Sequence, residues 1–223
     1  MLRPYVGVIM MSNDKHRRRS IRLRGYDYSK AGAYFVTVCS EDRQCIWGDI
    51  AEGQMKRNLL GDVVLACWAN LPHHFPHLEL DAFTVMPNHV HGIVVITHRR
   101  GEASGPNTRT PGLAAPDASP LPHPIGTRPG SLGAIIQNFK SVSTRRINTI
   151  RGAPGLPVWQ RNYYEHIVRN AEELHRIRQY IVNNPMQWAL DRENPAVAGV
   201  GASRPVGTPL RDDVDDLLGG IRP

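Results

Sequence analysis

Cysteine is scarce in this chain, with three residues among 223, and no two of them form a Cys-x-x-Cys pair. Cys39, Cys45 and Cys67 therefore predict neither a zinc knuckle nor a disulfide framework, and such scattered thiols are typical of a reducing cytosol. No apolar run approaches the roughly 20 residues that a membrane-spanning helix needs. The first residues are mildly apolar but lack a leading cationic region, which argues against a signal peptide. We expect a cytoplasmic protein with no membrane partner.

Acidic residues are the second shortage, because 20 Asp and Glu stand against 27 Lys and Arg. The resulting net charge of +7 and pI near 9.7 favour a polyanionic partner, of which nucleic acid is the commonest, and hence a location at the nucleoid. The 20 Gly and 18 Pro indicate that part of the chain lacks regular structure. We divide the chain into a flexible basic arm at 1–21, a folded domain at 22–195 with a disordered insert at 98–128, and a flexible tail at 196–223.

Strands and helices follow one another in the folded domain. β-branched and aromatic runs favour strands, and apolar residues at a spacing of three and four favour helices. Pro72 and Pro185 are expected to stop the helices that precede them. In chain order we expect strands at 33–39 and 45–50, a helix at 59–71, an antiparallel strand pair at 78–86 and 89–96, a helix from 132 to 147, an aromatic stretch at 158–166, and a last helix at 171–184.

The run Met-Pro-Asn-His-Val-His-Gly at 86–92 leads into the apolar strand residues Ile93 to Ile96. In an extended chain alternate side chains share a face, so His89 and His91 point the same way. Two imidazoles on one face can chelate a divalent metal ion, which needs at least one further ligand. The alternative is that both are polar residues at the end of a strand, which is unremarkable in a chain with ten histidines.

The last helix carries Tyr180-Ile-Val-Asn-Asn-Pro. Tyr180 and Asn184 are four residues apart and therefore lie on one helical face, whereas Asn183 lies on another. An amide oxygen at Asn184 suits Mg²⁺ or Mn²⁺, and a phenol beside such an ion can act as a nucleophile once a positive environment helps it to lose its proton. The periodicity alone also fits Tyr180 as an amphipathic residue packed against the core.

Three basic segments are candidates for contacts with DNA phosphates. Each has a plain alternative, namely a solvated tail, a solvated helix face, and a strand packed on the core. His73, His74 and His77 follow the first helix in a loop, and we interpret them as surface residues. The candidate DNA contacts are Arg17, Arg18, Arg19, Arg22 and Arg24 in the N-terminal arm, Lys140, Arg145 and Arg146 on the second long helix, and Arg161 in the aromatic stretch.

Three motifs in this order resemble one known family. They are Met-Pro-Asn-His-Val-His-Gly at 86–92, Val-Trp-Gln-Arg-Asn-Tyr-Tyr-Glu-His-Ile-Val-Arg-Asn at 158–170, and Tyr-Ile-Val-Asn-Asn-Pro at 180–185. Together they resemble the single-tyrosine HUH transposases of the IS200/IS605 type, and most of all the REP-associated tyrosine transposases. The resemblance covers about 22–195, interrupted by the insert.

The resemblance implies a ferredoxin-like α+β fold, in which an antiparallel sheet is backed by helices. It also implies that His89, His91 and Asn184 hold Mg²⁺ or Mn²⁺, and that Tyr180 attacks a DNA phosphodiester. The product is a 5′-phosphotyrosine and a free 3′-hydroxyl, from which the strand can be rejoined in DNA transposition and recombination. Substrates in the family are single-stranded DNA with hairpins, such as repetitive extragenic palindromes.

Several alternatives remain open after the resemblance. Tyr163 and Tyr164 are rival nucleophiles, although they precede the last helix. The chain is either a monomer or a homodimer. The chief competing function is a hairpin-binding module of domesticated transposase origin that has lost its chemistry. A weaker one is a histidine-based metal hydrolase without a covalent intermediate.

Overall fold

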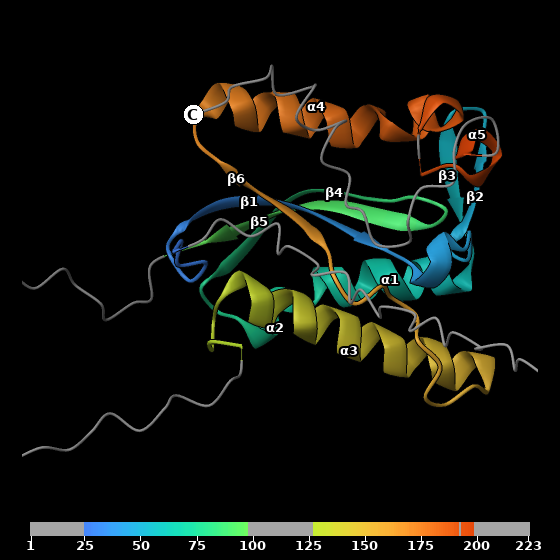
Figure 1. Ribbon diagram of the computed structural model, residues 1–223, viewed down its shortest axis with the longest axis horizontal. Coiled ribbons are helices and arrows are strands. Elements are labelled where there is room, and N and C mark those ends of the chain that lie inside the picture. Colours follow the sequence, from blue (N-terminus) through green and yellow to red (C-terminus); the bar gives the residue numbers. More distant parts are fainter. Residues whose placement is uncertain (1–24, 98–126, 192, 199–223) are drawn as a thin grey trace, which may run out of the picture.

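A four-stranded antiparallel sheet forms the centre of the protein, as the computed structural model shows for residues 25–97, 127–191 and 193–198 (Figure 1). Its strand order is β4-β5-β1-β6. With one helix after β1, a hairpin between β4 and β5, and one long helix before β6, this is the ferredoxin-like α+β arrangement that the resemblance implied. The strands are β1 (Gly32–Cys39), β4 (Leu78–Val85), β5 (His89–Ile96) and β6 (Tyr164–Val168).

Helices cover both faces of this sheet (Figure 1). One face carries α1, α2 and α3, and α1 packs against α3. The other face carries α4, which contacts β4 and also β3 of a separate hairpin. The remaining bounds are β2 (Gly48–Ala51), β3 (Gln54–Arg57), α1 (Leu59–Ala69), α2 (Leu71–His74), α3 (Leu132–Arg151), α4 (Ala171–Gln187), α5 (Pro195–Ala198), and the 3₁₀ turns η1 (Glu41–Arg43) and η2 (Trp188–Leu190).

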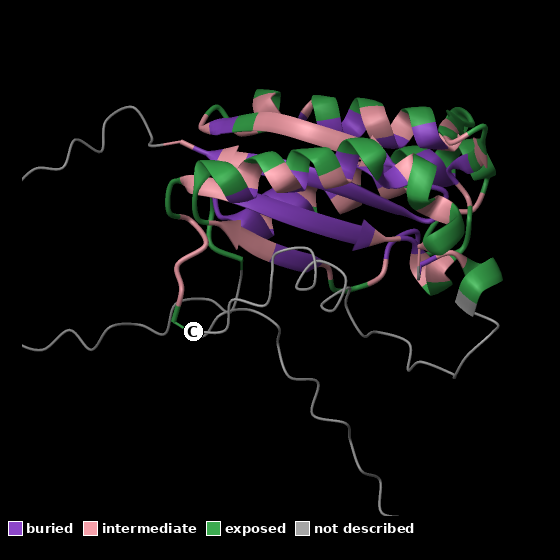
Figure 2. Ribbon diagram, turned by 90° about the horizontal axis from the view of Figure 1, so that it is seen from above, coloured by how far each residue is buried: buried purple, intermediate pink, exposed green. Residues whose placement is uncertain are grey.

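Strand β5 divides its side chains between the two helix layers, because successive residues of a strand point to opposite faces. Val90 and Val94 belong to the larger apolar cluster, which is built with α1 and α3, whereas Ile93 belongs to the smaller cluster with Phe35 under α4. Figure 2 shows the buried strands between helices whose outer faces are exposed. Gly92 is required where α1 crosses the strand, since a Cβ there would lie 2.4 Å from the Trp68 ring.

Strand β4 contains an irregularity that its sequence did not reveal. The register with β5 shifts between Leu80 and Phe83, as in a β-bulge. This shift places Leu80 and Phe83 in the same apolar cluster although they are three residues apart. Asp81 lies inside the bulge and pairs with Arg178 of α4, so the bulge also helps to hold α4 on the sheet.

In the first half of the chain two expected boundaries were wrong and one strand was not expected. The first helix ends at Ala69, and Leu71 starts the short helix α2, so His73 and His74 lie at its exposed end and not in a loop. The expected strand at 45–50 lies at 48–51 and pairs with β3, which the sequence analysis missed. Positive φ angles at Glu52 (55°) and Gly53 (70°) give the tight turn of this hairpin.

Pro185 does not stop the last helix, because α4 continues to Gln187. A proline in the last turn removes only one hydrogen bond of the helix, to the carbonyl four residues earlier. The helix α3 also runs beyond the expected end to Arg151, and Gly152 caps it with a φ of 60°, the left-handed conformation common at helix ends.

Several predictions lie outside the described residues, namely the N-terminal arm at 1–21, nearly all of the insert at 98–128, and nearly all of the tail at 196–223. The strand pair at 78–86 and 89–96 and the first strand are confirmed. Within the described ranges, none of the helices has the length and apolar character needed to cross a membrane.

Candidate active site

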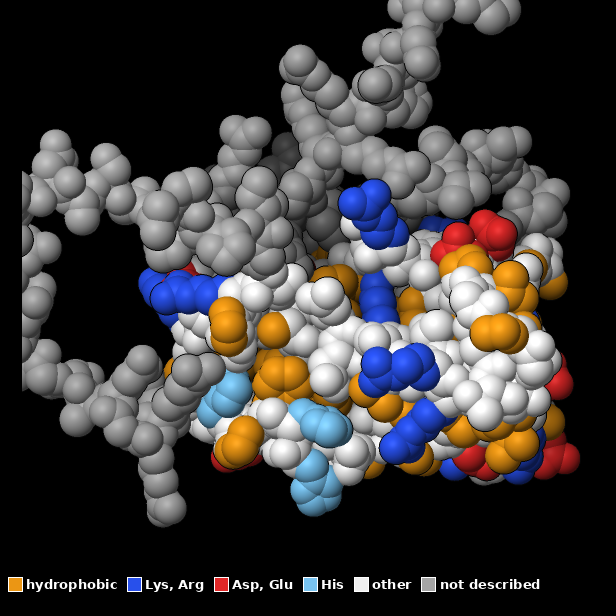
Figure 3. Space-filling model, turned by 90° about the horizontal axis from the view of Figure 1, so that it is seen from below, with side chains coloured by type: hydrophobic (Ala, Val, Ile, Leu, Met, Phe, Trp, Pro, Cys, Tyr) orange, Lys and Arg blue, Asp and Glu red, His pale blue; other side chains and the backbone are white. Residues whose placement is uncertain are grey.

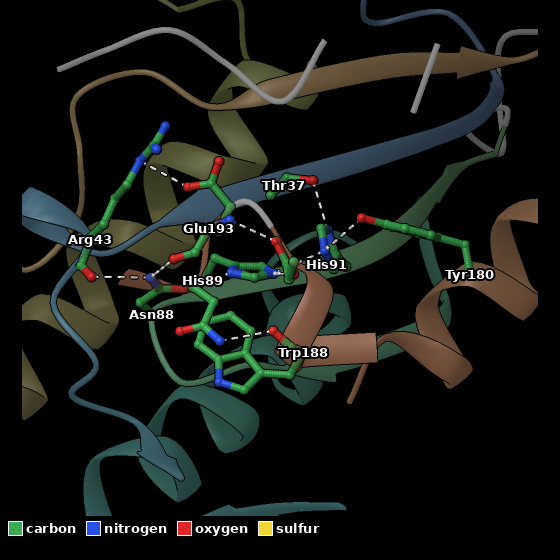
Figure 4. Close-up of polar contacts among 10 residues, drawn as sticks. Thr37, Arg43, Asn88, His89, His91, Tyr180, Trp188 and Glu193 are labelled. Atoms are coloured by element: carbon green, nitrogen blue, oxygen red, sulfur yellow. Dashed lines mark hydrogen bonds and ion pairs between the residues drawn. The ribbon is translucent and has the colours of Figure 1, made fainter. Parts of the chain in front are cut away.

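The two histidines of β5 face each other on the α4 side of the sheet (Figure 4). Their Nε2 atoms are 3.0 Å apart, and both side chains are 0% exposed. The two histidines share a face because alternate residues of a strand point the same way, as the sequence predicted. The tip of the hairpin between β4 and β5 fixes where β5 begins. At this tip the Ser40 amide donates to the Asn88 carbonyl (2.8 Å), and the Trp47 amide donates to the Pro87 carbonyl (3.1 Å).

Hydrogen bonds on the far side of each imidazole set its orientation. The Asn88 amide nitrogen donates to the carbonyls of Arg43 (3.1 Å) and Glu193 (2.6 Å), so the Asn88 oxygen must face the other way. His89 Nδ1–H donates to that oxygen at 2.8 Å, which leaves the lone pair of His89 on Nε2. The Nδ1 atom of His91 lies 2.8 Å from the Thr37 hydroxyl, its register neighbour on β1.

Both imidazoles are held in the neutral form. Burial, together with a smaller contribution from the positive charge of Arg43, lowers the pKa of His89 to about 3. Burial also lowers the pKa of His91 well below its ordinary value, with a second contribution from His89. A neutral imidazole has one nitrogen lone pair, which is the form that binds a metal ion.

Tyr180 reaches the histidine pair from α4. Its hydroxyl lies 3.4 Å from His91 Nε2, and its ring packs edge-on against Phe35, with ring centres 6.1 Å apart. The tyrosine is placed by its helix, because Ile177 and Ile181 on the same side of α4 are buried in the cluster with Phe35.

The start of α4 is also firmly held. The Asn170 side chain caps the helix by accepting from the Glu173 amide (2.8 Å), and Glu173 in turn accepts from His166 of β6 (2.9 Å). The contact between Glu173 and His166 joins α4 to the sheet about two turns before Tyr180. The last residues of the segment at 158–166 belong to strand β6, and through them the segment helps to hold α4.

The two asparagines after Tyr180 have opposite environments. Asn184 is buried, and its Oδ1 atom has no hydrogen-bond partner among the described residues. Asn183 is exposed. A buried amide oxygen without a donor is costly unless a cation or water meets it. Of the two amides, Asn184 therefore turns inward and Asn183 faces solvent.

The residues present fit a divalent cation. Two ligands in adjacent positions of an octahedral ion, each about 2.1 Å from it, are about 3.0 Å apart, as the two Nε2 atoms are. The orphaned oxygen of Asn184 is a further donor of the hard type. Across the described ranges no three His, Cys, Asp or Glu side chains are already grouped as a metal site, so the candidate rests on two imidazoles and an amide.

Residues after α4 complete the surroundings of the histidine pair. The sequence analysis did not identify them. Arg43 Nε pairs with Glu193 at 2.8 Å, and the Asp191 carboxylate lies 3.8 Å from His89 Nε2. Burial raises the pKa of Asp191. No motif marks these positions, because only the path of the chain beyond Trp188 brings them to β5.

The other tyrosines lie elsewhere. Tyr163 contacts the ammonium of Lys140 on α3, 5.4 Å from the ring centre, and so belongs to the opposite side of the sheet. Tyr164 is buried on β6, and its ring centre is 6.1 Å from that of Phe35. Of the three tyrosines, it is Tyr180 whose hydroxyl the structure places next to the candidate ligand His91.

The candidate DNA contacts do not surround this site. Lys140 donates to the carbonyls of Gln160 (2.8 Å), Arg161 (3.3 Å) and Asn162 (2.9 Å), so its three donors already tie α3 to the segment before β6. Burial lowers the Lys140 pKa to about 8. A phosphate contact by Lys140 would have to replace one of these bonds.

Arg145 and Arg146 are exposed on α3, on the face of the sheet opposite Tyr180. Figure 3 shows this side of the molecule, where Lys, Arg and His side chains outnumber acidic ones. A recess of about 380 Å³ lies there, lined by Phe75, Gln137, Asn138, Ser141 and Arg145 among others. The predicted contacts Arg17, Arg18, Arg19, Arg22 and Arg24 lie outside the described residues.

A second, shallow recess of about 230 Å³ runs along α4 beside Tyr180. Its lining combines Arg176, His175 and Gln179 with the tyrosine. Arg161 is exposed in the segment before β6. The surfaces on α3 and on α4 are therefore separate, with the sheet between them.

No protein-family model matches the sequence. Among solved structures, the chain is similar to a REP-associated tyrosine transposase bound to a REP hairpin, with 17% identity, 77% of this chain and 76% of that chain covered, and a TM-score of 0.47. It is also similar to a candidate transposase of Deinococcus radiodurans, with 18% identity, coverage of 73% and 95%, and a TM-score of 0.37. Scores this low carry no conclusion about chemistry.

The sequence itself has a nearer relative. It is 39% identical over 178 residues to an uncharacterized protein of Haemophilus influenzae, and the aligned part covers 79% of this chain and 93% of that protein. Identity at this level over most of both chains indicates common descent and a shared fold. The chain belongs to the same protein family as this Haemophilus influenzae protein.

Proposed function

We propose that the protein is a metal-dependent single-stranded DNA endonuclease and strand transferase, which forms a 5′-phosphotyrosine through Tyr180 on hairpin-containing DNA. One observation carries the proposal. The Tyr180 hydroxyl lies 3.4 Å from Nε2 of His91, whose Nε2 is 3.0 Å from that of His89, although the tyrosine and the histidines come from separate elements. A nucleophile next to two neutral imidazoles, whose Nε2 atoms are as close together as two adjacent ligands of one ion, is the arrangement this chemistry needs.

The proposed reaction conserves the energy of the phosphodiester. The Tyr180 oxygen attacks phosphorus, the bond from phosphorus to the 3′-oxygen breaks, and that oxygen leaves with a proton as a 3′-hydroxyl. The 5′ end stays on the tyrosine. Attack by a 3′-hydroxyl on the phosphotyrosine reverses these changes and rejoins the strand without a nucleotide cofactor.

His89, His91 and Asn184 are the residues proposed to hold Mg²⁺ or Mn²⁺. When bound, such an ion neutralises charge on the phosphate and polarises phosphorus. The protein supplies the orientation, since Asn88 and Thr37 hold the far nitrogens of the two imidazoles. Helix α4 supplies the nucleophile on a rigid element, which keeps Tyr180 in a single place beside His91.

The proposed path of the DNA uses both basic surfaces. The recess with His175, Arg176 and Gln179 runs beside Tyr180 and suits a single strand at the point of cleavage. Arg145 and Arg146 on α3 suit the stem of a hairpin, and a strand joining the two surfaces has to pass around an edge of the sheet. Arg161 and the N-terminal arm are further candidates for phosphate contacts.

The test is a covalent-trapping experiment. Protein is incubated with end-labelled hairpin DNA and Mn²⁺, and the products are separated under denaturing conditions. We expect an adduct with the wild type and none with Tyr180→Phe. Tyr163→Phe is the matched control, because it removes the same hydroxyl on the α3 side and should leave the yield unchanged.

An adduct at full yield with Tyr180→Phe would overturn the assignment of the nucleophile. A shift in hairpin mobility without any adduct, and without an effect of His91→Gln, would instead favour the DNA-binding module that lacks chemistry. Cleavage without a trapped intermediate would favour a metal hydrolase.

A further inference from the structure

The chain after α4 folds back over the histidine pair and is tied there by two contacts. We call residues 188–191 and 193–194 the strap. The Glu193 carboxylate pairs with Arg43 Nε at 2.8 Å, and the Glu193 carbonyl accepts from the Asn88 side chain at 2.6 Å (Figure 4). The Trp188 ring centre lies 6.0 Å from that of His89. The strap thus contributes to the complete burial of both imidazoles.

Asp191 lies in the middle of this strap with its carboxylate turned inward. Its side chain is 9% exposed. One oxygen, Oδ1, accepts from the Glu193 amide at 2.7 Å. The other, Oδ2, is buried and has no hydrogen-bond partner among the described residues. An uncompensated buried carboxylate costs several kcal/mol, so this oxygen requires a positively charged neighbour.

The protein itself offers little compensation at that oxygen. The nearest basic group that the structure records is His89, at 3.8 Å, and burial keeps His89 neutral. Arg43 Nε already pairs with Glu193 of the same strap. The buried oxygens of Asp191 and Asn184 thus have no hydrogen-bond donor among the described residues, and the lone pair of His89 points toward His91 Nε2, 3.0 Å away. A single cation would satisfy all three.

We propose that Asp191 is a ligand of the divalent cation at the histidine pair, in addition to His89, His91 and Asn184. Two adjacent ligands of one octahedral ion lie about 3.0 Å apart, and Asp191 Oδ2 lies 3.8 Å from His89 Nε2, so the carboxylate is not yet grouped with the histidines as a ligand and has to approach by less than about 1 Å to share their ion. The inference rests on the metal site of the proposed function and adds to it an anionic oxygen from a different segment.

The same side chain, Asn88, links the two halves of this extended site. Its oxygen orients His89, and its nitrogen holds the strap through the Glu193 carbonyl. A hard divalent cation prefers carboxylate oxygen, and each carboxylate added to a site raises its affinity. Closure of the strap and retention of the ion are therefore coupled, and release of the strap removes the anionic ligand.

The inference is tested with Mn²⁺ alone, by isothermal titration of the full chain without DNA. Asp191→Asn keeps the volume and the acceptor for the Glu193 amide but removes the charge. We expect it to bind Mn²⁺ about tenfold or more weakly than the wild type. Asp62→Asn is the matched control, because Asp62 is an exposed carboxylate that pairs with Arg57, and its loss should leave Mn²⁺ affinity unchanged.

The unfolding midpoint without metal is measured in parallel. A purely structural role of Asp191 would lower this midpoint and leave the Mn²⁺ affinity within twofold of the wild type, and that result would overturn the inference. The outcome is separable from the proposed function, since Tyr180→Phe should abolish the DNA adduct and retain Mn²⁺ binding. Absence of Mn²⁺ binding by the wild type would overturn both.

Discussion

The two faces of the central sheet differ in what they bury. The side toward α1 and α3 is a continuous apolar layer, in which large side chains such as Trp68 and Phe139 are almost fully buried. The side toward α4 has a smaller apolar cluster around Phe35, next to the buried polar groups His89 and His91. The central strands β1 and β5 each supply side chains to both sides.

This difference separates the side chains that stabilise the fold from the side chains proposed to form the site. Apolar burial stabilises a fold in proportion to area, and the α1 and α3 side has most of it. Buried polar groups contribute little or cost stability unless every one is paired, and on the α4 side the oxygens of Asn184 and Asp191 are not paired within the described chain. The indole nitrogens of Trp47 and Trp68 on the other side also have no hydrogen-bond partner among the described residues, but only amide and carboxylate oxygens can be satisfied by a cation. Three predictions test this division.

The largest expected effect is on the apolar side. Trp68→Ala removes a ring that stacks on Phe83 at 4.5 Å and meets Phe139 at 5.3 Å, so it should lower the free energy of unfolding by about 3–5 kcal/mol. Denaturant titration measures this loss. Val182→Ala on the exposed side of α4 is the control and should change it by less than about 0.5 kcal/mol. A similar loss in both variants would contradict the division.

The second prediction concerns pH in the absence of metal. Burial lowers the folded-state pKa of His89 to about 3, whereas an unfolded histidine titrates near 6.5. The unfolded chain therefore binds more protons below pH 6.5, and stability is complete above that pH and falls as the pH drops toward 3. At pH 5 the loss from His89 should be about 2 kcal/mol.

The measurement is denaturant unfolding at pH 7 and pH 5 in the presence of a chelator. His89→Gln should show a smaller loss between the two pH values than the wild type, because it removes the titrating group. His73→Gln, at an exposed position of α2, should behave as the wild type. An unchanged pH dependence in His89→Gln would show that His89 is not held neutral.

The smallest expected effect is at the partner of His91. Thr37→Val keeps the shape but removes the hydroxyl that meets His91 Nδ1 at 2.8 Å, and Mn²⁺ affinity should fall about tenfold because the ring loses its orientation. Calorimetric titration measures the affinity. Thr84 is the register neighbour of His91 on β4, with no hydrogen bond to His91 among the described residues, so Thr84→Val is the control. Equal Mn²⁺ affinities of the two variants would show that Thr37 does not orient His91 for metal binding.

Much of the fold was predictable because its signals are local. The β-branched run before Cys39, the hairpin around Pro87 and the apolar period of α4 each depend on neighbours in sequence, and each was confirmed. The errors have equally definite causes. The bulge at Asp81 and the hairpin at Gly53 depend on pairing partners, and Pro185 is tolerated because it lies in the last turn of its helix.

Reasoning from local sequence predicted only part of the candidate site. A strand period of two put His89 and His91 on one face, and a helix period near four put Tyr180 and Asn184 on another, so the sequence by itself determined these pairs. The meeting of the two pairs, the separation of Arg145 from them by the sheet, and the arrival of Asp191 were decided only by the tertiary structure. The reason is physical: side-chain direction within an element follows backbone geometry, whereas distances between elements depend on how the whole chain packs.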